Sequence, residues 1–322
     1  MTEPRVLCMV DVSGAAKGMA RLRDVANVDC RQPDRNVLID RIGEYDALWS
    51  HTDLKIDAEV LAAAGRLKVI NTASTGTDHI DRQETERKGI RILSITRDYG
   101  LLDTFTATAE CAWMLIMTSF RHFKAATRDV LGGDWRGPLF RGRQLSLKTL
   151  GVLGVGRLGT MACELGKAFR MRVLGCDLKP FEIPGVEPVD HDTLLRESDV
   201  ITVHVHMTPE NYHLLNADTL ARMKDGAVLV NTSRGDIIDE TVLIAALESG
   251  KLSAFGGDVL HNEWRRDMGD SPVVQYARTH DNVVITPHIG GCTFESIWNA
   301  RNFSAKKLAH YLQTGEELTF PR

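Results

Sequence analysis

Three ionisable side chains stand at comparable places in the second half of the chain, each a few residues after an apolar, strand-like segment. Arg234 follows AVLVNTS, Glu263 follows AFGGDVL, and His288 follows NVVITP. In an open parallel sheet, ligands bind outside the carboxyl ends of the strands. If these segments are strands of one such sheet, an arginine, a carboxylate and a histidine meet at one edge.

This combination of side chains suits the movement of a proton next to a bound carboxylate. A histidine titrates near neutral pH and can give a proton to an oxygen or take one from it. A nearby carboxylate favours the imidazolium and so raises the pKa of the histidine. A guanidinium grips a carboxylate with two hydrogen bonds and polarises a neighbouring carbonyl. Such a set would serve hydride transfer at a carbinol carbon, which requires a proton to leave or reach the oxygen.

A glycine pattern between two predicted strands indicates the cofactor. Gly154, Gly156 and Gly159 have the spacing GxGxxG after an apolar strand and at the start of a helical segment, and Asp177 ends the next strand. The first glycine permits a tight turn, the second lets the backbone approach a pyrophosphate, and the third allows close packing of helix on strand. The helix N-terminus offers unpaired N–H groups to the phosphates. This segment is therefore predicted to bind a dinucleotide.

The acidic residue after the second strand distinguishes NAD from NADP. Asp177 would accept hydrogen bonds from the adenosine ribose hydroxyls and repel a 2′-phosphate, which favours NAD. Lys179 lies two residues further on, so NADP is less favoured rather than excluded. An S-adenosylmethionine methyltransferase would also have a glycine-rich loop and an acidic second strand. The third glycine, the number of strands and the three charged residues favour the NAD enzyme.

The elements that must position these residues alternate between short apolar runs and helix-period segments, which is typical of parallel α/β folds. The first hundred residues contain a helical segment at 57–65 and predicted strands at 5–10, 45–50, 67–72 and 89–95. No glycine fingerprint follows the first of these strands. Further strands are predicted at 149–153, 172–177, 200–206, 227–232, 253–259 and 283–286. A final helix is expected at about 294–313.

We therefore predict an α/β protein with two doubly wound parallel-sheet domains. A Rossmann NAD-binding domain, residues 103–293, is inserted into a flavodoxin-like substrate domain made of residues 1–102 and 294–322. At 322 residues, the chain exceeds the size at which a single core usually stops growing. The cleft between two such domains is a natural ligand site.

A long helical stretch, 103–131, is expected to open the second domain. Apolar residues recur in it at steps of three and four, namely Ala109, Trp113, Ile116, Phe120 and Phe123. Ordinary core packing accounts for such a stripe, and its length also allows a role between subunits. We expect a homodimer formed through the 103–135 region.

The composition is that of a soluble globular protein, with 43% hydrophobic and 25% charged residues and a net charge of -4. No block of lysine and arginine points to nucleic acid or to a membrane surface. The longest apolar run, CAWMLIM at 111–117, is too short to span a membrane. The N-terminus lacks the basic start and apolar run of a signal peptide. The expected location is the cytoplasm.

Cysteines and histidines give no sign of a disulfide framework or a metal site. The cysteines have no CxxC spacing and mostly lie in apolar segments, so we predict buried thiols at positions 8, 30, 111, 163, 176 and 292. His204 and His206 share one face of a predicted strand, but no acidic or cysteine residue has a suitable spacing to complete a metal site. No metal is expected.

Taken together, these motifs resemble the D-isomer-specific, NAD-dependent 2-hydroxyacid dehydrogenase family. The matching segments are LGVLGVGRLG, LVNTSRGDIIDETVLIAALESGKL, FGGDVLHNE and ITPHIGG, all within about 143–296, and STGTDHID at 74–81. The resemblance implies an oxidoreductase that acts on the CH–OH group of 2-hydroxy acids. Its partners would be NAD and a small 2-hydroxy or 2-keto acid.

The resemblance also implies a role for each residue at a matching position. Arg234 would bind the substrate carboxylate and carbonyl, His288 would be the acid/base, and Glu263 would be the partner of His288. Asp258 would meet the nicotinamide carboxamide.

The remaining implied positions bind the substrate from the other domain or line the cofactor groove. Backbone N–H groups around Ser74, Thr75 and Gly76 would hold the substrate carboxylate. The implied cofactor-binding residues are Thr75, Gly154, Gly156, Arg157, Leu158, Gly159, Asp177, Val205, His206, Thr232, Ser233, Arg234, Asp258, His288 and Gly291.

Several positions depart from the usual pattern of the family. The loop 96–102, the segment after Glu263 and the sequence VHVH replace more common segments. Bulky or charged residues that could face the substrate are Arg97, Tyr99, Trp135, Arg141 and Trp264. The side chain of the substrate is therefore expected to differ from the commonest one.

Single residues argue against two related activities. Formate dehydrogenases of the superfamily have a glutamine where this chain has Glu263, and phosphite dehydrogenase has a lysine at the position of Thr75. The leading hypothesis is an NAD-dependent D-2-hydroxyacid dehydrogenase, or 2-keto acid reductase, whose domains close and expel water before hydride transfer. The alternative is a catalytically weak NAD(H)-sensing binding protein of the same fold, since the family includes such members.

Overall fold

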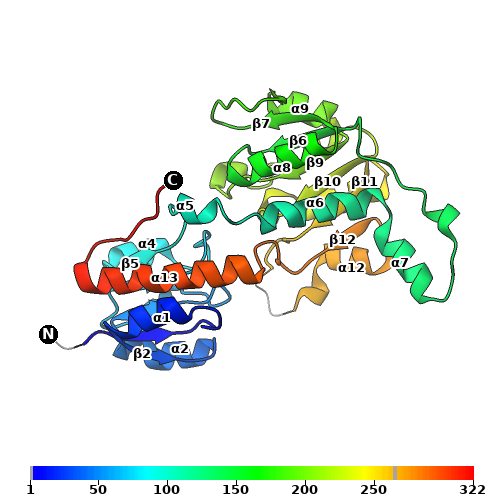
Figure 1. Ribbon diagram of the computed structural model, residues 1–322. Helices are drawn as coiled ribbons and strands as arrows, with labels where there is room; N and C mark the ends of the chain where they lie inside the picture. Colours follow the sequence, from blue (N-terminus) through cyan, green and yellow to red (C-terminus); the bar gives the residue numbers. More distant parts are fainter. Residues whose placement is uncertain (1–2, 264–266) are drawn as a thin grey trace. The chain divides into compact units, whose positions relative to one another are not determined.

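The computed structural model describes residues 3–263 and 267–322 (Figure 1). The chain divides into two compact units. Unit 1 consists of Met1–Phe105 and Cys292–Arg322, and unit 2 consists of Thr106–Gly291. The domain boundaries predicted from the sequence, 102/103 and 293/294, lie three and two residues away from these divisions.

Unit 1 is built on a five-stranded sheet in which every neighbouring pair of strands is parallel. The strand order, β2-β1-β3-β4-β5, is that of a flavodoxin-like sheet. The strands are β1 (Arg5–Cys8), β2 (Asn27–Cys30), β3 (Ala47–Trp49), β4 (Val69–Asn71) and β5 (Arg91–Leu93). Strand β2 was not predicted, because this edge strand (NVDC) is only partly buried and has no apolar run.

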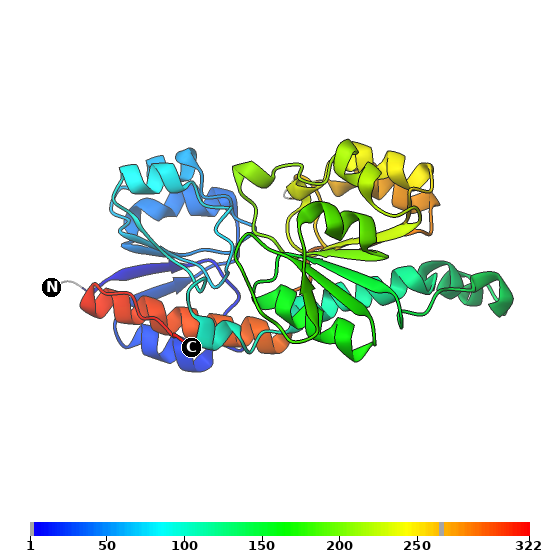
Figure 2. The same ribbon diagram turned by 90° about the horizontal axis from the view of Figure 1, so that it is seen from above.

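Helices cover both faces of the unit 1 sheet, as Figure 2 shows. Residues Cys8 and Trp49 pack toward the first and last helices of the chain, whereas Leu7 and Leu48 pack toward the opposite face, because side chains alternate across a strand. The elements are α1 (Ala16–Arg23) with α13 (Phe294–Thr314) on one face, and α2 (Arg35–Arg41), η1 (Ile42–Glu44), α3 (Ala58–Ala63) and α4 (Arg82–Arg87) on the other. A short helix, α5 (Tyr99–Leu102), follows β5.

Unit 2 is built on a seven-stranded parallel sheet of order β12-β11-β10-β9-β6-β7-β8. Counted within the unit, its first six strands follow the Rossmann order 3-2-1-4-5-6, and β12 extends the sheet. The strands are β6 (Thr149–Leu153), β7 (Arg172–Cys176), β8 (Val186–Pro188), β9 (Val200–Val203), β10 (Ala227–Asn231), β11 (Leu252–Gly257) and β12 (Val283–Ile285). Strand β8 (VEP) is a polar edge strand and was not predicted.

The helices of unit 2 also form two layers, one on each face of its sheet (Figures 1 and 2). Leu150, Val152 and Val230 pack against the first layer, and Leu153, Ile201 and Leu229 pack against the second. The first layer holds α6 (Ala107–Phe120) and α8 (Arg157–Ala168), and the second holds α9 (His191–Glu197), α10 (Ala217–Arg222), α11 (Glu240–Glu248) and α12 (Pro272–Thr279). The remaining elements are α7 (Phe123–Leu131), η2 (Gly137–Phe140), η3 (Pro209–Asn211), η4 (Gly235–Ile237) and η5 (Met268–Asp270).

The long helix predicted at 103–131 is wrong as a single element. It is interrupted before α6 begins at Ala107 and again at His122, whose left-handed backbone (φ 49°) separates α6 from α7. Four of the five stripe residues are buried, but Phe123 lies beyond this break and is 58% exposed. A change of helix axis at His122 turns Phe123 away from the core that the rest of the stripe fills.

The prediction of buried cysteines is also partly wrong. Cys8 and Cys163 are buried, whereas Cys30 lies on edge strand β2 and Cys292 precedes α13, and both are exposed. The other two, Cys111 and Cys176, are half-buried.

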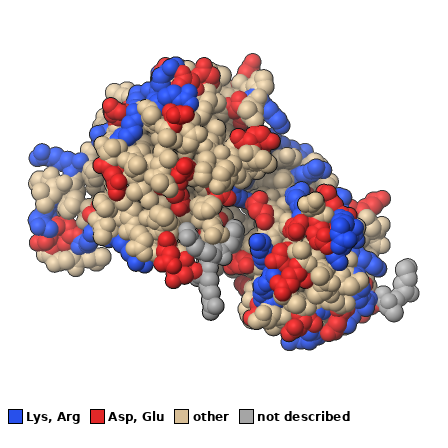
Figure 3. Space-filling view, turned by 180° about the vertical axis from the view of Figure 1, so that it is seen from behind, with Lys and Arg blue, Asp and Glu red and all other residues tan. Residues whose placement is uncertain are grey.

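On the face drawn in Figure 3, lysine and arginine are interspersed with aspartate and glutamate on both units. Among the described residues, no helix combines the length and the apolar character needed to cross a membrane.

Candidate active site

The three residues singled out from the sequence follow three adjacent strands of the unit 2 sheet. Arg234 lies after β10, Glu263 after β11 and His288 after β12. These strands are parallel neighbours, so their carboxyl ends meet at one edge. The order of the strands therefore brings the arginine, the carboxylate and the histidine to the same edge of the sheet.

The histidine and the carboxylate form a hydrogen-bonded pair. His288 Nδ1 lies 2.6 Å from Glu263 Oε1, and the glutamate side chain is only 15% exposed. This hydrogen bond raises the pKa of His288 above its ordinary value, against the effect of burial, which favours the neutral ring. The charge of Arg234 also acts to lower the pKa of His288, which shows that the guanidinium lies within electrostatic reach of the imidazole.

Asp258 fixes the turn that carries His288. Its backbone carbonyl accepts a hydrogen bond from the N–H of His288 at 2.8 Å. Its carboxylate accepts from Thr286 Oγ1 at 2.5 Å and from the N–H groups of Ile289 and Gly290 at 2.9 and 2.7 Å. His288 has a left-handed backbone (φ 52°), which is uncommon for a residue other than glycine and persists only where the surroundings enforce it. We assign that enforcement to the 2% exposed Asp258.

Arg234 is fixed through the main chain on both sides of it. Asn231 Nδ2 donates to Arg234 O at 2.8 Å, and Asn231 Oδ1 accepts from the N–H of Ser233 at 3.0 Å. The guanidinium itself donates through Nη1 to Ser233 O at 2.8 Å. A Cβ on Gly235 would lie 2.0 Å from the carbonyl carbon of Leu260, so only glycine allows the Arg234 segment to approach the segment that leads to Glu263.

A second histidine–carboxylate pair, which the sequence reasoning missed, links the same two segments. His261 Nδ1 is hydrogen-bonded to Asp236 Oδ1, and the N–H of His261 donates to Glu240 Oε1 at 2.8 Å. Both members of the pair are well exposed. The sequence signal was an acidic residue two positions after Arg234 and a histidine two positions before Glu263.

The three glycines of the fingerprint occupy three different environments. Gly154 has φ 92°, and a Cβ there would also meet the backbone of His204 at 2.8 Å. A Cβ on Gly159 would lie 1.9 Å from Gly154 O, whereas a Cβ on Gly156 would meet nothing within 4 Å. The first and third glycines thus serve the packing of the turn, and the second leaves space at the N-terminus of α8.

The surroundings of the glycine loop supply polar groups that suit a dinucleotide. Asp177 follows β7 and accepts from the N–H groups of Val155 and Lys179 at 2.7 and 2.9 Å, which places its carboxylate beside the loop. Thr232 Oγ1 is buried and has no hydrogen-bond partner among the described residues. Ser233 Oγ donates to Val205 O, so the segments after β9 and β10 are joined here. A buried hydroxyl without a partner and an open space over Gly156 both fit a bound NAD.

Other predicted cofactor residues border the same edge of the sheet. Arg157 and Leu158 open α8, His206 follows β9, and Gly291 follows the His288 turn. His204, by contrast, hydrogen-bonds Thr202 Oγ1 through Nε2 at 3.0 Å, and burial lowers its pKa to about 4. Within the described residues, no three His, Cys, Asp or Glu side chains gather in a way that could hold a metal ion.

In unit 1, the loop after β4 has the polar arrangement of an anion-binding turn. The carbonyls of Ser74, Thr75 and Gly76 accept hydrogen bonds from Ile95 N, Thr96 Oγ1 and Ser74 Oγ. Among the described residues, no hydrogen bond is donated by the N–H groups of Thr75, Gly76 or Thr77. Carbonyls are thus occupied while successive N–H groups remain available to an anion.

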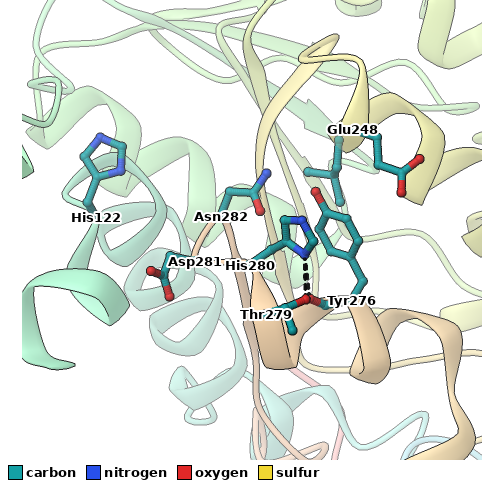
Figure 4. A pocket seen from close by; sticks show the side chains of 8 residues that line it. His122, Glu248, Tyr276, Thr279, His280, Asp281 and Asn282 are labelled. Carbon is teal, nitrogen blue, oxygen red and sulfur yellow. Dashed lines mark hydrogen bonds between the residues drawn. The ribbon is translucent and has the colours of Figure 1, made fainter.

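A cavity of about 550 Å³ lies at the other edge of the unit 2 sheet (Figure 4). Its walls come from the C-terminal ends of α11 and α12, which precede the amino ends of β11 and β12, and from the start of α7. The lining residues are His122, Leu247, Glu248, Tyr276, Thr279, His280, Asp281 and Asn282. This cavity is therefore separate from the His288 edge.

Two residues expected to face the substrate also belong to that far edge. The N-terminus of α6 lies at the His288 edge, because a Cβ on Gly290 would be 3.3 Å from Thr108 Cγ2. The helix then runs about 20 Å to Phe120, whose carbonyl accepts from Arg143 N at 2.9 Å. Trp135 and Arg141 lie in this far segment, so they are remote from the His288 edge of their own unit 2. Trp264 lies outside the described residues.

Comparisons with known proteins place the chain in a family. Residues 113–290 match the model of the NAD binding domain of D-isomer specific 2-hydroxyacid dehydrogenases. The chain belongs to this family of NAD-dependent oxidoreductases, and the family and the two-sheet α/β fold predicted from the sequence are confirmed.

Individual relatives carry related activities in their names. The chain is 36% identical to a hydroxypyruvate reductase from Thermotoga maritima over 82% of this chain and 83% of that protein. It is 37% identical to a D-3-phosphoglycerate dehydrogenase from Archaeoglobus fulgidus over 86% of this chain, but it spans only about half (51%) of that relative. The crystal structure of D-lactate dehydrogenase from Aquifex aeolicus, complexed with NAD and lactic acid, has 29% identity and a TM-score of 0.84 over 99% of this chain and 100% of that one.

Proposed function

We propose that this protein interconverts a 2-keto acid and the corresponding D-2-hydroxy acid with NAD as its cofactor. The observation that carries the proposal is the 2.6 Å hydrogen bond between His288 Nδ1 and Glu263 Oε1, made within electrostatic reach of Arg234. A proton donor and a guanidinium at one edge are what a 2-keto acid needs for protonation of its carbonyl oxygen.

Two groups bind the substrate carboxylate in this proposal. The planar fork of Arg234 makes paired hydrogen bonds to carboxylates, and it also polarises the adjacent carbonyl. The backbone N–H groups of the loop Ser74, Thr75 and Gly76 supply the second set of donors, and the occupied carbonyls of that loop support this role.

His288 exchanges the proton in both directions. Because Nδ1 is hydrogen-bonded to Glu263, the proton passes through Nε2. In reduction, the imidazolium donates to the carbonyl oxygen, and Glu263 keeps more of the enzyme in this acid form by raising the pKa of His288. In oxidation, the neutral ring accepts the proton of the hydroxyl group.

The residues present fit a bound dinucleotide, which when bound supplies or accepts the hydride. The open space over Gly156 and the N-terminus of α8 would hold the pyrophosphate. Asp177 would hold the adenosine ribose and disfavour a 2′-phosphate, so NAD is preferred to NADP. Thr232 Oγ1, buried without a partner among the described residues, would find one in the cofactor.

Short 2-keto acids are the substrates we expect. Relatives are named hydroxypyruvate reductase, glyoxylate reductase and D-lactate dehydrogenase. The loop that follows β5 would then select among such acids, because Thr96 Oγ1 donates to Thr75 O at 2.7 Å and the next residues include the exposed Arg97 and Tyr99. A charged and an aromatic side chain thus stand beside the carboxylate-binding loop.

A homodimer formed through residues 103–135, here called the α6–α7 region, is part of the proposal. This region exposes several large apolar side chains. Single exposed apolar side chains are normal on a protein surface, whereas a contiguous group of them marks an interaction site. They are Met114, Met117, Phe123, Val130, Leu131 and Trp135, of which Leu131 and Trp135 are 83% and 87% exposed.

The experiment is NADH oxidation by the purified protein with a panel of 2-keto acids, including glyoxylate, pyruvate, hydroxypyruvate and 3-phosphohydroxypyruvate. We expect turnover with at least one acid, and a loss of about 10²-fold or more in His288→Ala at unchanged NADH affinity. His261→Ala removes the neighbouring histidine–carboxylate pair and is the matched control. Tight NADH binding without turnover of any acid would instead favour the NAD(H)-sensing protein.

A further inference from the structure

We propose that the buried ion pair of Lys307 and Asp98 is a positioning device for the loop that binds the substrate carboxylate. The inference rests on the proposed function of the loop Ser74–Gly76. It assigns a role to two charged residues that never touch the substrate, and it names the hydrogen bonds through which they act.

The pair is completely enclosed within unit 1. Lys307 of α13 and Asp98, which precedes α5, both have side chains that are 0% exposed. Lys307 Nζ lies 2.7 Å from Asp98 Oδ2 as an ion pair, without the alignment of a hydrogen bond. Lysine is almost never fully buried unless it is paired. A buried pair contributes little net stability compared with apolar residues of similar size, so the main effect we assign to this one is to fix the geometry of the segments around it.

Lys307 has further partners that spread its charge over two segments. Nζ donates to Ser94 O at 2.8 Å and to Glu317 Oε1 at 3.1 Å. Burial acts to raise the pKa of Glu317, but hydrogen bonds from Arg91 and Lys307 outweigh it, so the pKa stays below its ordinary value and the group is an anion. The ammonium therefore holds the start of the 94–98 loop by its carbonyl and the segment after α13 by a carboxylate.

The segment after α13 closes over the same loop. Asp98 Oδ1 accepts from Phe320 N at 2.8 Å, and Gly100 N donates to Phe320 O at 2.9 Å. A Cβ on Gly100 would lie 2.6 Å from Pro321 O, so glycine is required for this approach. Both ends of the 94–100 segment are thus fixed through Lys307 and Asp98.

From the fixed loop, hydrogen bonds lead directly to the carboxylate-binding residues. Ser94 Oγ lies 2.9 Å from Thr96 Oγ1, and Thr96 Oγ1 in turn donates to Thr75 O at 2.7 Å. Ile95 N donates to Ser74 O at 3.3 Å. These bonds turn the carbonyls of Ser74 and Thr75 toward the 94–96 segment. The peptide N–H groups on the other side of those planes are then presented to an anion.

The inference predicts a specific kinetic signature. Loss of the relay would leave the N–H groups present but less well oriented, which weakens carboxylate binding without changing proton transfer at His288. KM for the 2-keto acid should rise, while kcat and NADH affinity stay close to their wild-type values. A purely structural role would instead lower the thermal stability and the active fraction of the enzyme.

The test uses the whole protein and a matched pair of substitutions at the exposed residue Thr96. Thr96→Val removes the donor to Thr75 O, and Thr96→Ser keeps it. We expect KM for the best 2-keto acid to rise about tenfold in the valine variant, the equivalent of one hydrogen bond, and to stay at the wild-type value in the serine variant. Lys307→Met combined with Asp98→Asn removes both buried charges at similar volume and should raise KM at least as much.

Amide hydrogen exchange supplies a second readout that needs no turnover. Exchange in the 72–80 segment should speed up in Thr96→Val, whereas exchange in 57–65, around α3 of the same unit, should not change. An unchanged KM in an active enzyme, or an unchanged exchange rate at 72–80, would overturn the inference. If the wild-type protein reduces no 2-keto acid, the proposed function fails, and the exchange result alone decides whether the relay orders the loop.

Discussion

The imidazole of His288 and the carboxylate of Glu263 share a 2.6 Å hydrogen bond although 25 residues separate them along the chain. Each stands in a turn with one left-handed residue, at φ 52° for His288 itself and φ 51° for Asn262 beside Glu263. Asparagine and histidine are among the non-glycine residues that adopt this left-handed conformation most readily. The geometry of the pair is therefore set by two left-handed turns of the main chain as well as by the side chains.

Glu263→Gln should move the pH dependence of 2-keto acid reduction to lower pH. Reduction requires the imidazolium, so its rate falls as the pH rises through the pKa of His288. Glu263 raises that pKa, and its removal lets the ring lose its proton at a lower pH. The measurement is kcat/KM for reduction against pH.

Asp236→Asn is the control for that profile, because Asp236 pairs with His261 instead. Its midpoint should match the wild-type value. A wild-type midpoint in Glu263→Gln would remove the basis for assigning Glu263 as the partner of the acid/base. The hydrogen bond between His288 and Glu263 also makes the stability of the protein depend on pH. Its stabilising effect is complete below the pKa of histidine in the unfolded chain and is lost as the pH rises through the raised pKa of His288 in the folded protein.

Asp258→Asn should damage turnover through the His288 turn. An amide nitrogen cannot accept a hydrogen bond, so at least one of the three donors from Thr286, Ile289 and Gly290 would lose its acceptor. We expect kcat to fall and the protein to lose about 1–3 kcal/mol of stability, the typical effect of removing a buried, charge-assisted hydrogen bond. Steady-state NADH oxidation would measure kcat, and chemical denaturation would measure stability. A wild-type kcat in a stably folded variant would contradict the role of Asp258.

Asp177→Ala should erode the preference for NADH over NADPH. The carboxylate lies beside the glycine loop, held by the N–H groups of Val155 and Lys179. Its removal would take away the ribose hydrogen bonds and the repulsion of a 2′-phosphate, while Lys179 remains as an attractive charge. The measurement is the ratio of kcat/KM for the two cofactors. A ratio equal to that of the wild-type protein would exclude the ribose role.

Charged substitutions in the α6–α7 region should dissociate the proposed homodimer. Leu131→Glu and Trp135→Glu place a carboxylate on the most exposed apolar positions of that region. Burying an unpaired charge in an interface is costly, so we expect monomers in light scattering after size exclusion. Leu147→Glu changes an equally exposed leucine, at 85%, outside the region and should leave the mass unchanged. A monomeric wild-type protein would rule out the dimer at once.

Much of this candidate site could be predicted because its residues directly follow the carboxyl ends of strands. The strands that precede Arg234, Glu263 and His288 are mainly apolar runs, and parallel neighbours bring their carboxyl ends together. The meeting of Arg234, Glu263 and His288 at one edge of the sheet could therefore be predicted from their order along the chain. The glycine spacing likewise predicts a tight turn, because Gly154 and Gly159 stand where any Cβ atom would clash with the neighbouring backbone.

What escaped prediction depends on contacts between distant segments. His261 and Asp236 meet only because Gly235 lets two backbones approach closely. Lys307 stands in an otherwise amphipathic helix. Its partner in the buried ion pair, Asp98, lies more than two hundred residues earlier, so no local sequence pattern predicts that Lys307 is buried. The edge strands β2 and β8 were missed because half-exposed strands carry no apolar run.

The two places where the chain passes between the units lie close together on unit 2. Unit 2 begins at Thr106 and ends at Gly291, and Gly290 packs against Thr108. Unit 2 is therefore an insertion in unit 1 whose two ends are close together. Once unit 2 has folded, the entropy cost of closing this insertion is no larger than that of a short hairpin loop. An engineer could excise unit 2 at this base and join Phe105 to Cys292 with a few residues, or transplant a different nucleotide-binding module there.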